Sequence, residues 1–235
     1  MEDRQTLLNE FIIDLDSKMW KTRGSRYNAD RRLKRKSNLS LATISLLSFY
    51  VLIISIVSSF SVFNLNNTET GFLTFISIVI SIFIIVLSLL EASKEYSIKA
   101  ERLYTCANEI NRLMSELKFA QATITEIDKL EKEVYKIHNE YQLLIKNVKE
   151  NHDDIDFDLF RVANKKKPMK QLTKDLKQYE GEFEIGGFEI LKIYTKLALH
   201  YSLYYICIFG PLIILVISTF ILNDAGTPAK PVTGG

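Results

Sequence analysis

The chain has 235 residues, of which 47% are hydrophobic and 25% charged, averages that match an ordinary soluble protein. The apolar residues are not evenly spread, however. They gather in three stretches almost free of charge, which excludes a single soluble globular domain and a disordered chain. Two cysteines are too few to hold a fold of this size with disulfides.

The three apolar stretches are residues 39–63, 71–90 and 197–222. Runs of 18 or more uncharged, mostly apolar residues predict transmembrane helices. The first begins after 38 largely polar residues, so we interpret it as a span and not as a signal peptide. The predicted fold is an all-α membrane protein: a transmembrane hairpin, a third transmembrane helix and a helical cytoplasmic domain.

Basic residues indicate the topology. Residues 1–38 hold 10 Lys and Arg and residues 91–196 hold 19, whereas the loop 64–70 holds none. The positive-inside rule places both basic segments in the cytoplasm and the loop outside it. We expect the protein in the inner (plasma) membrane. The expected organisation is an N-terminal helix with a basic segment (residues 1–38), the hairpin (39–90), a cytoplasmic helical region (91–196), the third span (197–222) and a flexible tail (223–235).

The predicted N-terminal helix, residues 6–21, carries one apolar stripe opposite an acidic face, so we expect it to pack on the rest of the cytoplasmic domain. The stripe consists of Leu7, Leu8, Phe11, Ile12, Leu15 and Met19.

Residues 91–150 lack Gly and Pro and carry apolar residues at heptad-like spacing, with a shift of the seam near residues 124–130. Thr123 and Glu126 resemble a capping box, so the segment forms either one long helix or two that meet near residues 121–123. The stripe would be buried in a bundle with the N-terminal helix or in a helix-exchanged oligomer, and the sequence leaves both open.

Further along the chain, residues 164–170 are strongly basic and form either a solvated loop or a contact for lipid headgroups or nucleic acid. Gly181, Gly186 and Gly187 predict hinges before the third span, and Gly210-Pro211 predicts a kink within it. The last eleven residues have the composition of a linker.

Catalytic motifs are missing from the sequence, so we expect no enzyme activity, metal or cofactor. Asp154, Asp156 and Asp158 alternate as in a calcium loop, but Leu159 stands where that loop needs Gly. For His152, beside two aspartates, a structural hydrogen bond or helix cap is favoured over an acid–base role.

Hydroxyl side chains recur on one face of each of the first two spans. Such stripes turn toward other helices or toward water, so they predict either close helix packing or a hydrated pore lining. The positions are Ser45, Ser48, Ser55 and Ser59 in the first span and Thr74, Ser77, Ser81 and Ser88 in the second.

A basic cluster precedes the first span. It either sets the topology alone or also binds phosphates of a nucleotide or of lipid headgroups. Its members are Arg26, Arg31, Arg32, Lys34, Arg35 and Lys36.

A set of positions before the first span and in the later charged segment is familiar: Tyr27, Arg31-Arg32-Leu33, Tyr141, Asn151-His152 and Asp156-Phe157. In these positions, and roughly over residues 10–160, the sequence resembles the SLATT family, two-transmembrane effectors of bacterial conflict systems. The resemblance implies a pore-forming or membrane-disrupting effector. It also implies a trigger from a neighbouring gene, such as a nucleotide-messenger enzyme or a reverse transcriptase. The third apolar stretch departs from a two-span core.

Taken together, we expect a homo-oligomer in the lipid bilayer that forms or opens a pore and depolarises the membrane in antiphage defence. The alternative is a non-conducting anchor or scaffold for a cytoplasmic defence partner. A membrane enzyme or transporter is a third class, against which the missing site chemistry argues. Direct binding of nucleic acid is not expected.

Overall fold

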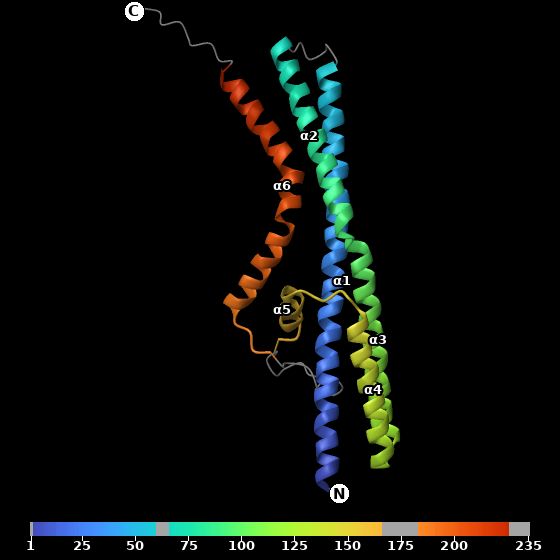
Figure 1. Ribbon diagram of the computed structural model, residues 1–235. Helices are drawn as coiled ribbons and strands as arrows, with labels where there is room; N and C mark the ends of the chain where they lie inside the picture. The colour runs from blue at the N-terminus through green and yellow to red at the C-terminus, as the bar shows by residue number, and fades with distance from the viewer. Residues whose placement is uncertain (1, 60–65, 166–182, 226–235) are drawn as a thin grey trace, which may run out of the picture. The chain divides into compact units, whose positions relative to one another are not determined.

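The structure is a computed structural model that describes residues 2–59, 66–165 and 183–225. Every regular element in these residues is an α-helix (Figure 1). The helices are α1 (Glu2–Ser59), α2 (Asn67–Lys94), α3 (Tyr96–Thr123), α4 (Ile127–Asn147), α5 (Asp154–Ala163) and α6 (Gly187–Ala225). The predicted all-α fold is confirmed.

The chain divides into two compact units. The helical unit comprises Met1–Ser37 and Glu95–Ala198, and the span unit comprises Asn38–Lys94 and Leu199–Gly235. The predicted N-terminal helix and first span are not separate elements, because α1 runs without a break from Glu2 to Ser59 and contributes to both units.

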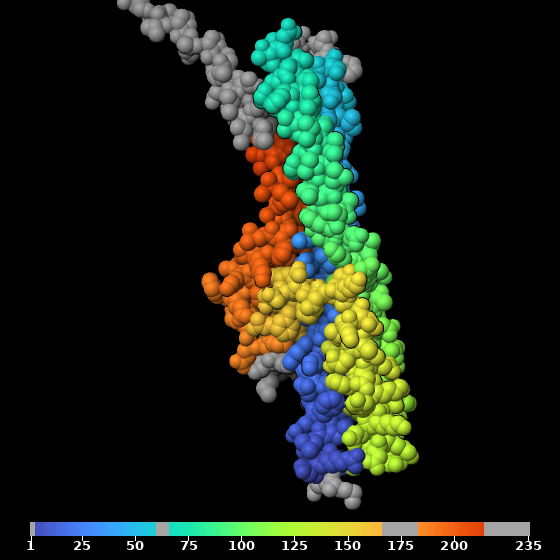
Figure 2. All heavy atoms as spheres, in the orientation of Figure 1, coloured from blue at the N-terminus to red at the C-terminus, as the bar shows by residue number. Residues whose placement is uncertain are grey.

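In the helical unit, α3 and α4 lie side by side with the first half of α1 (Figure 1), and α5 covers part of α1 (Figure 2). Apolar side chains of all four helices form one core, to which α4 contributes Val134, Ile137 and Tyr141. The heptad-like stripe is therefore buried within a single chain, as one of the two alternatives predicted. Helix exchange is not needed to cover it.

The N-terminal stripe is only partly buried. Ile12, Leu15 and Met19 enter the core, but Leu7 is 60% and Phe11 42% exposed. A second, smaller cluster joins α1 to α3 through Ala29, Leu33, Ala100 and Leu103.

Two breaks interrupt the helix predicted over residues 91–150. The break between α3 and α4 falls close to the predicted place, but the capping box there is wrong: Thr123 donates its hydroxyl to the carbonyl of Phe119, 2.8 Å away, and Glu126 makes no capping side-chain bond. The break between α2 and α3 was not expected. It lies at Glu95, whose φ of 50° is left-handed and stops the helix without a glycine.

In the span unit, apolar side chains face outward. Three helices are long and apolar enough to cross a membrane: α1, the helix that begins at Asn67, and α6. Pro211 lies inside α6, where the kink was predicted. Most of the basic stretch 164–170, Gly181 and the residues after Ala225 lie outside the described residues.

Candidate functional site

An ion pair in the helical unit ties α1 to α5. Arg32 binds Asp156 with two hydrogen bonds, from Nε to Oδ1 at 2.7 Å and from Nη2 to Oδ2 at 2.9 Å. Asp156 is completely buried and Arg32 is 6% exposed. A second carboxylate, that of the exposed Asp153, lies 2.7 Å from Arg32 Nη2. Because buried charges need partners, each side chain depends on the other.

Asp156 also holds the beginning of its own helix. Its carboxylate accepts the backbone N–H of Asp153 at 2.9 Å, and Asp153 completes a capping box. The backbone carbonyl of Asp156 accepts a hydrogen bond from Asn28 Nδ2 at 3.0 Å. One aspartate thus stabilises the first turn of α5 and joins this turn to two positions on α1. The helix cap belongs to Asp153 and not to His152.

The close approach of α5 to α1 depends on Gly24. A Cβ at this position would lie 2.1 Å from Phe160 Cδ2. The Phe160 ring meets Trp20 edge to face, with the ring centroids 4.7 Å apart. Only a residue without a side chain leaves room for this aromatic contact.

Arg26 is a buried cation on the same helix. It is 2% exposed, and its Nη1 donates to the Cys106 thiol on α3. Its Nε has no hydrogen-bond partner among the described residues. Burial raises the pKa of Cys106 and that of Tyr141, so both neighbours are uncharged at neutral pH.

His152 completes this buried group. Its Nδ1 is buried and has no hydrogen-bond partner in the described part of the chain. Burial first, and then the positive charge of Arg26, lowers the pKa of His152 below 6.5. The imidazole is therefore neutral at pH 7. The Tyr141 hydroxyl is bonded to Thr22 on α1 at 3.0 Å.

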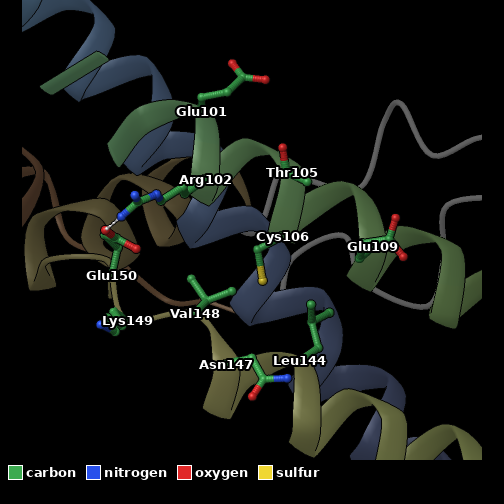
Figure 3. A pocket seen from close by; sticks show the side chains of 10 residues that line it. All are labelled: Glu101, Arg102, Thr105, Cys106, Glu109, Leu144, Asn147, Val148, Lys149 and Glu150. Atoms are coloured by element: carbon green, nitrogen blue, oxygen red, sulfur yellow. Dashed lines mark hydrogen bonds and ion pairs between the residues drawn. The ribbon is translucent and has the colours of Figure 1, made fainter. Parts of the chain in front are cut away.

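A pocket of about 470 Å³ opens beside Cys106 (Figure 3). One wall is α3 and the other is the end of α4 with the segment that leads to α5. Arg102 and Glu150 close one side with an ion pair of 2.6 Å. The hydrogen bond from Arg102 holds the pKa of Glu150 below its usual value. The Cys106 sulfur points from α3 toward α1 (Figure 3).

The predicted basic cluster is not one site. Arg32 is bound to Asp156 and Arg26 to Cys106, whereas Lys34 pairs with Asp30 at 2.9 Å. The ammonium groups of Lys34 and Lys36 also lie over the rings of Tyr104 and Tyr96. Arg31 and Arg35 are exposed. Four of the six side chains thus bind four different partners.

The hydroxyl stripes lie in the span unit, where most of these side chains bond to their own helix. Ser48, Ser59, Thr74, Ser81 and Ser88 each donate to the carbonyl four residues earlier, and Ser77 to the one three residues earlier. In α2, Ser77, Ser81 and Ser88 are half-buried and Thr74 is exposed. In α1, Ser48 is half-buried, and Ser45, Ser55 and Ser59 are exposed.

Sequence reasoning missed a buried carboxylate at the end of the second span. Glu91 is 9% exposed, accepts the Tyr204 hydroxyl at 3.0 Å and lies 3.2 Å from Lys94 Nζ. One helical turn further along α6, the Ile208 carbonyl accepts the Tyr50 hydroxyl at 3.1 Å. These two bonds attach α6 to both helices of the hairpin. The sequence signal that could have revealed this carboxylate is a glutamate directly after one apolar run, together with tyrosines in another apolar run.

The sequence was compared with family models, curated proteins and solved structures. Residues 8–222 match the model of SMODS and SLOG-associating 2TM effector domain family 5. The chain belongs to this family. No curated protein and no solved structure matches.

Membership in this SLATT family makes the protein a membrane effector of conflict systems. The match extends beyond residue 160, where the resemblance seen in the sequence ended, and includes the whole third apolar stretch. The third helix is thus part of the family's domain. Of the positions that carried the resemblance, Arg32, Tyr141, His152 and Asp156 line the interfaces of α1 with α4 and α5, and Asn151 is exposed.

Proposed function

We propose that this SLATT protein is an antiphage effector that oligomerises in the inner membrane and, when triggered, forms or opens a pore that depolarises the cell. One observation carries the proposal: the polar face of α1, with Ser45, Ser55 and Ser59, is exposed in the single chain. Hydroxyl groups gain nothing from lipid, and small polar residues favour close contact between membrane helices. The same face of further copies of the chain would cover these side chains.

Assembly is expected to use the spans. The heptad-like stripe of α4 is already buried against α1 and α3, so it offers no free seam for a second copy. A ring with closed symmetry is the default for such a homo-oligomer. In that ring, the serine faces would pack helix to helix when the pore is closed and turn toward a central water path when it is open.

Weak ion selectivity follows from the composition of the predicted path. Residues 39–63 and 71–90 contain no charged side chain, so a pore lined by them has no ring of charges. Passage of several small ions would collapse the membrane potential without any catalytic step. Growth would then stop before a phage completes its cycle.

The proposed orientation keeps residues 1–38 and 91–196 in the cytoplasm, where a trigger made by a neighbouring gene would meet the helical unit. It rests on the distribution of Lys and Arg. A reporter enzyme fused after Thr68 should be active outside the cytoplasm. Activity of that fusion only in the cytoplasm would contradict this topology.

A non-conducting scaffold is the second candidate, and the pocket beside Cys106 favours it, because a partner or ligand could bind there without any change in the spans. Membrane potential separates the two. Cells that express the chain with its genomic neighbours are followed with a potential-sensitive dye during phage challenge. The pore predicts depolarisation at or before growth arrest. Growth arrest with an intact potential would reject the pore and favour the scaffold.

A further inference from the structure

The helical unit buries a positive charge, that of Arg26, which forms no ion pair with the described residues. Arg26 is 2% exposed, and no carboxylate of the described residues lies within ion-pair distance of its guanidinium. Its hydrogen-bonding neighbour is the Cys106 thiol, and its Nε is unpartnered. Burial of an unpaired charge is among the most costly arrangements in a protein core.

A second unsatisfied nitrogen belongs to the same group. His152 Nδ1 is buried without a partner, and its imidazole lies close enough to Arg26 to feel its charge. Tyr141 and Cys106, which also face Arg26, are neutral. A guanidinium with a free N–H, beside an imidazole, is the donor set that proteins use to bind an oxyanion.

We propose that Arg26 and His152 form a binding site for one oxyanion group, a phosphate or a carboxylate carried by a small molecule. The anion would pair directly with Arg26 and accept its free Nε–H. The small molecule would be the trigger of the effector, and this role rests on the proposed function, whereas binding itself does not require conduction by the spans.

The pocket beside Cys106 is next to this group, because the Cys106 side chain both lines the pocket and bonds to Arg26. Residues 147–150 form one of its walls, and the same connection carries His152 two residues later. Lys149 on the wall would attract an anion, whereas Arg102 is already paired with Glu150, and Glu101 and Glu109 line the same pocket. Their negative charge disfavours a polyphosphate, so the site suits a single phosphate or carboxylate.

The test uses the full chain in detergent, with the fluorescence of Trp20, the one tryptophan, as the unfolding signal. Inorganic phosphate in one arm and acetate in the other replace chloride at constant ionic strength. The melting temperature should rise steadily with one of the two anions, because a ligand that binds the folded state stabilises it. Phosphate and acetate distinguish the two sources of the oxyanion. No shift with either would overturn the proposal.

Arg26→Met should abolish the anion-dependent shift, and Arg26→Lys, which retains the charge but lacks Nε, should reduce it. The matched control is Arg23→Met, one helical turn earlier, which removes a half-buried arginine bonded to Asn111 and should leave the shift intact. Equal shifts in the two methionine variants would reject the site.

Stability without added anion gives a second criterion. Without the anion, the buried Arg26 charge is unpaired and costs stability. In chloride, the melting temperature of Arg26→Met should therefore be no lower than that of the wild type. A large loss of stability, or failure to fold, would show that Arg26 is a structural residue and overturn the proposal. Because these readouts are binding and melting, they stay separate from failure of the pore, which is measured as membrane potential.

Discussion

Arg32 and Asp156, 124 positions apart in the chain, form a buried two-point ion pair that fixes the first turn of α5 on α1. The same carboxylate caps α5, so the pair joins a local and a long-range contact in one side chain. Loss of either partner leaves the other charged and buried.

Asp156→Asn should therefore destabilise the helical unit by about 3–5 kcal/mol, the usual cost of breaking a buried pair. Asp153→Asn is the matched control: it removes the exposed partner of the same arginine but keeps a good N-cap residue, and should cost about 1 kcal/mol or less. Chemical unfolding followed by Trp20 fluorescence measures both. Similar costs for the two variants would show that Arg32 does not depend on Asp156.

The sequence could predict the helices but not this pair. Apolar periodicity located the core of α4, and the resemblance pointed to Arg32 and Asp156 separately. Nothing local links a basic residue before a span with an acidic residue at the start of a short helix. The break at Glu95 was missed for a related reason: a left-handed glutamate leaves no Gly or Pro signal in the sequence.

In the span unit, spacing predicted the serine stripes, since the helical period alone places residues on one face. It did not predict which stripe the chain itself covers, because that depends on how α1, α2 and α6 pack. Glu91 was missed as a buried residue because its partner, Tyr204, lies in a different apolar run.

Gly24→Ala should weaken the docking of α5, because the new methyl group would overlap the Phe160 ring. We expect a loss of about 1–3 kcal/mol, as for other overpacked sites, together with a change in Trp20 fluorescence. Gly71→Ala is the control, since nothing lies within 4 Å of its Cβ position. A normal melting temperature for Gly24→Ala would contradict the close contact between α1 and α5.

The stability of the helical unit should fall as the pH drops below about 6.5. The pKa of His152 is lower in the folded chain than its ordinary 6.5, so the unfolded chain binds the proton at a higher pH. Acidification therefore stabilises the unfolded chain relative to the folded one. This site contributes a slope of at most about 1.4 kcal/mol per pH unit. His152→Asn should flatten the profile in this window. An identical profile in that variant would assign the pH dependence to other groups.

Tyr204→Phe should loosen the attachment of α6 to α2, because Glu91 loses its hydroxyl donor while staying buried. An unsatisfied buried acceptor costs about 1–3 kcal/mol, so the variant should unfold earlier in detergent titrations. Tyr194→Phe removes a hydroxyl from an exposed tyrosine on the same helix and should have little effect. Equal behaviour of the two variants would argue against a role for the Glu91 bond.

Thiol labelling tests most directly whether the serine face of α1 lines a water path. Ser55→Cys and, as matched control, Ile53→Cys, an exposed apolar position elsewhere around the same helix, are compared with the wild type in triggered cells. We predict that a membrane-impermeant thiol reagent modifies Ser55→Cys after triggering and slows depolarisation, while Ile53→Cys behaves as the wild type. Depolarisation with Ser55→Cys unmodified, or with both cysteines equally modified, would contradict the account.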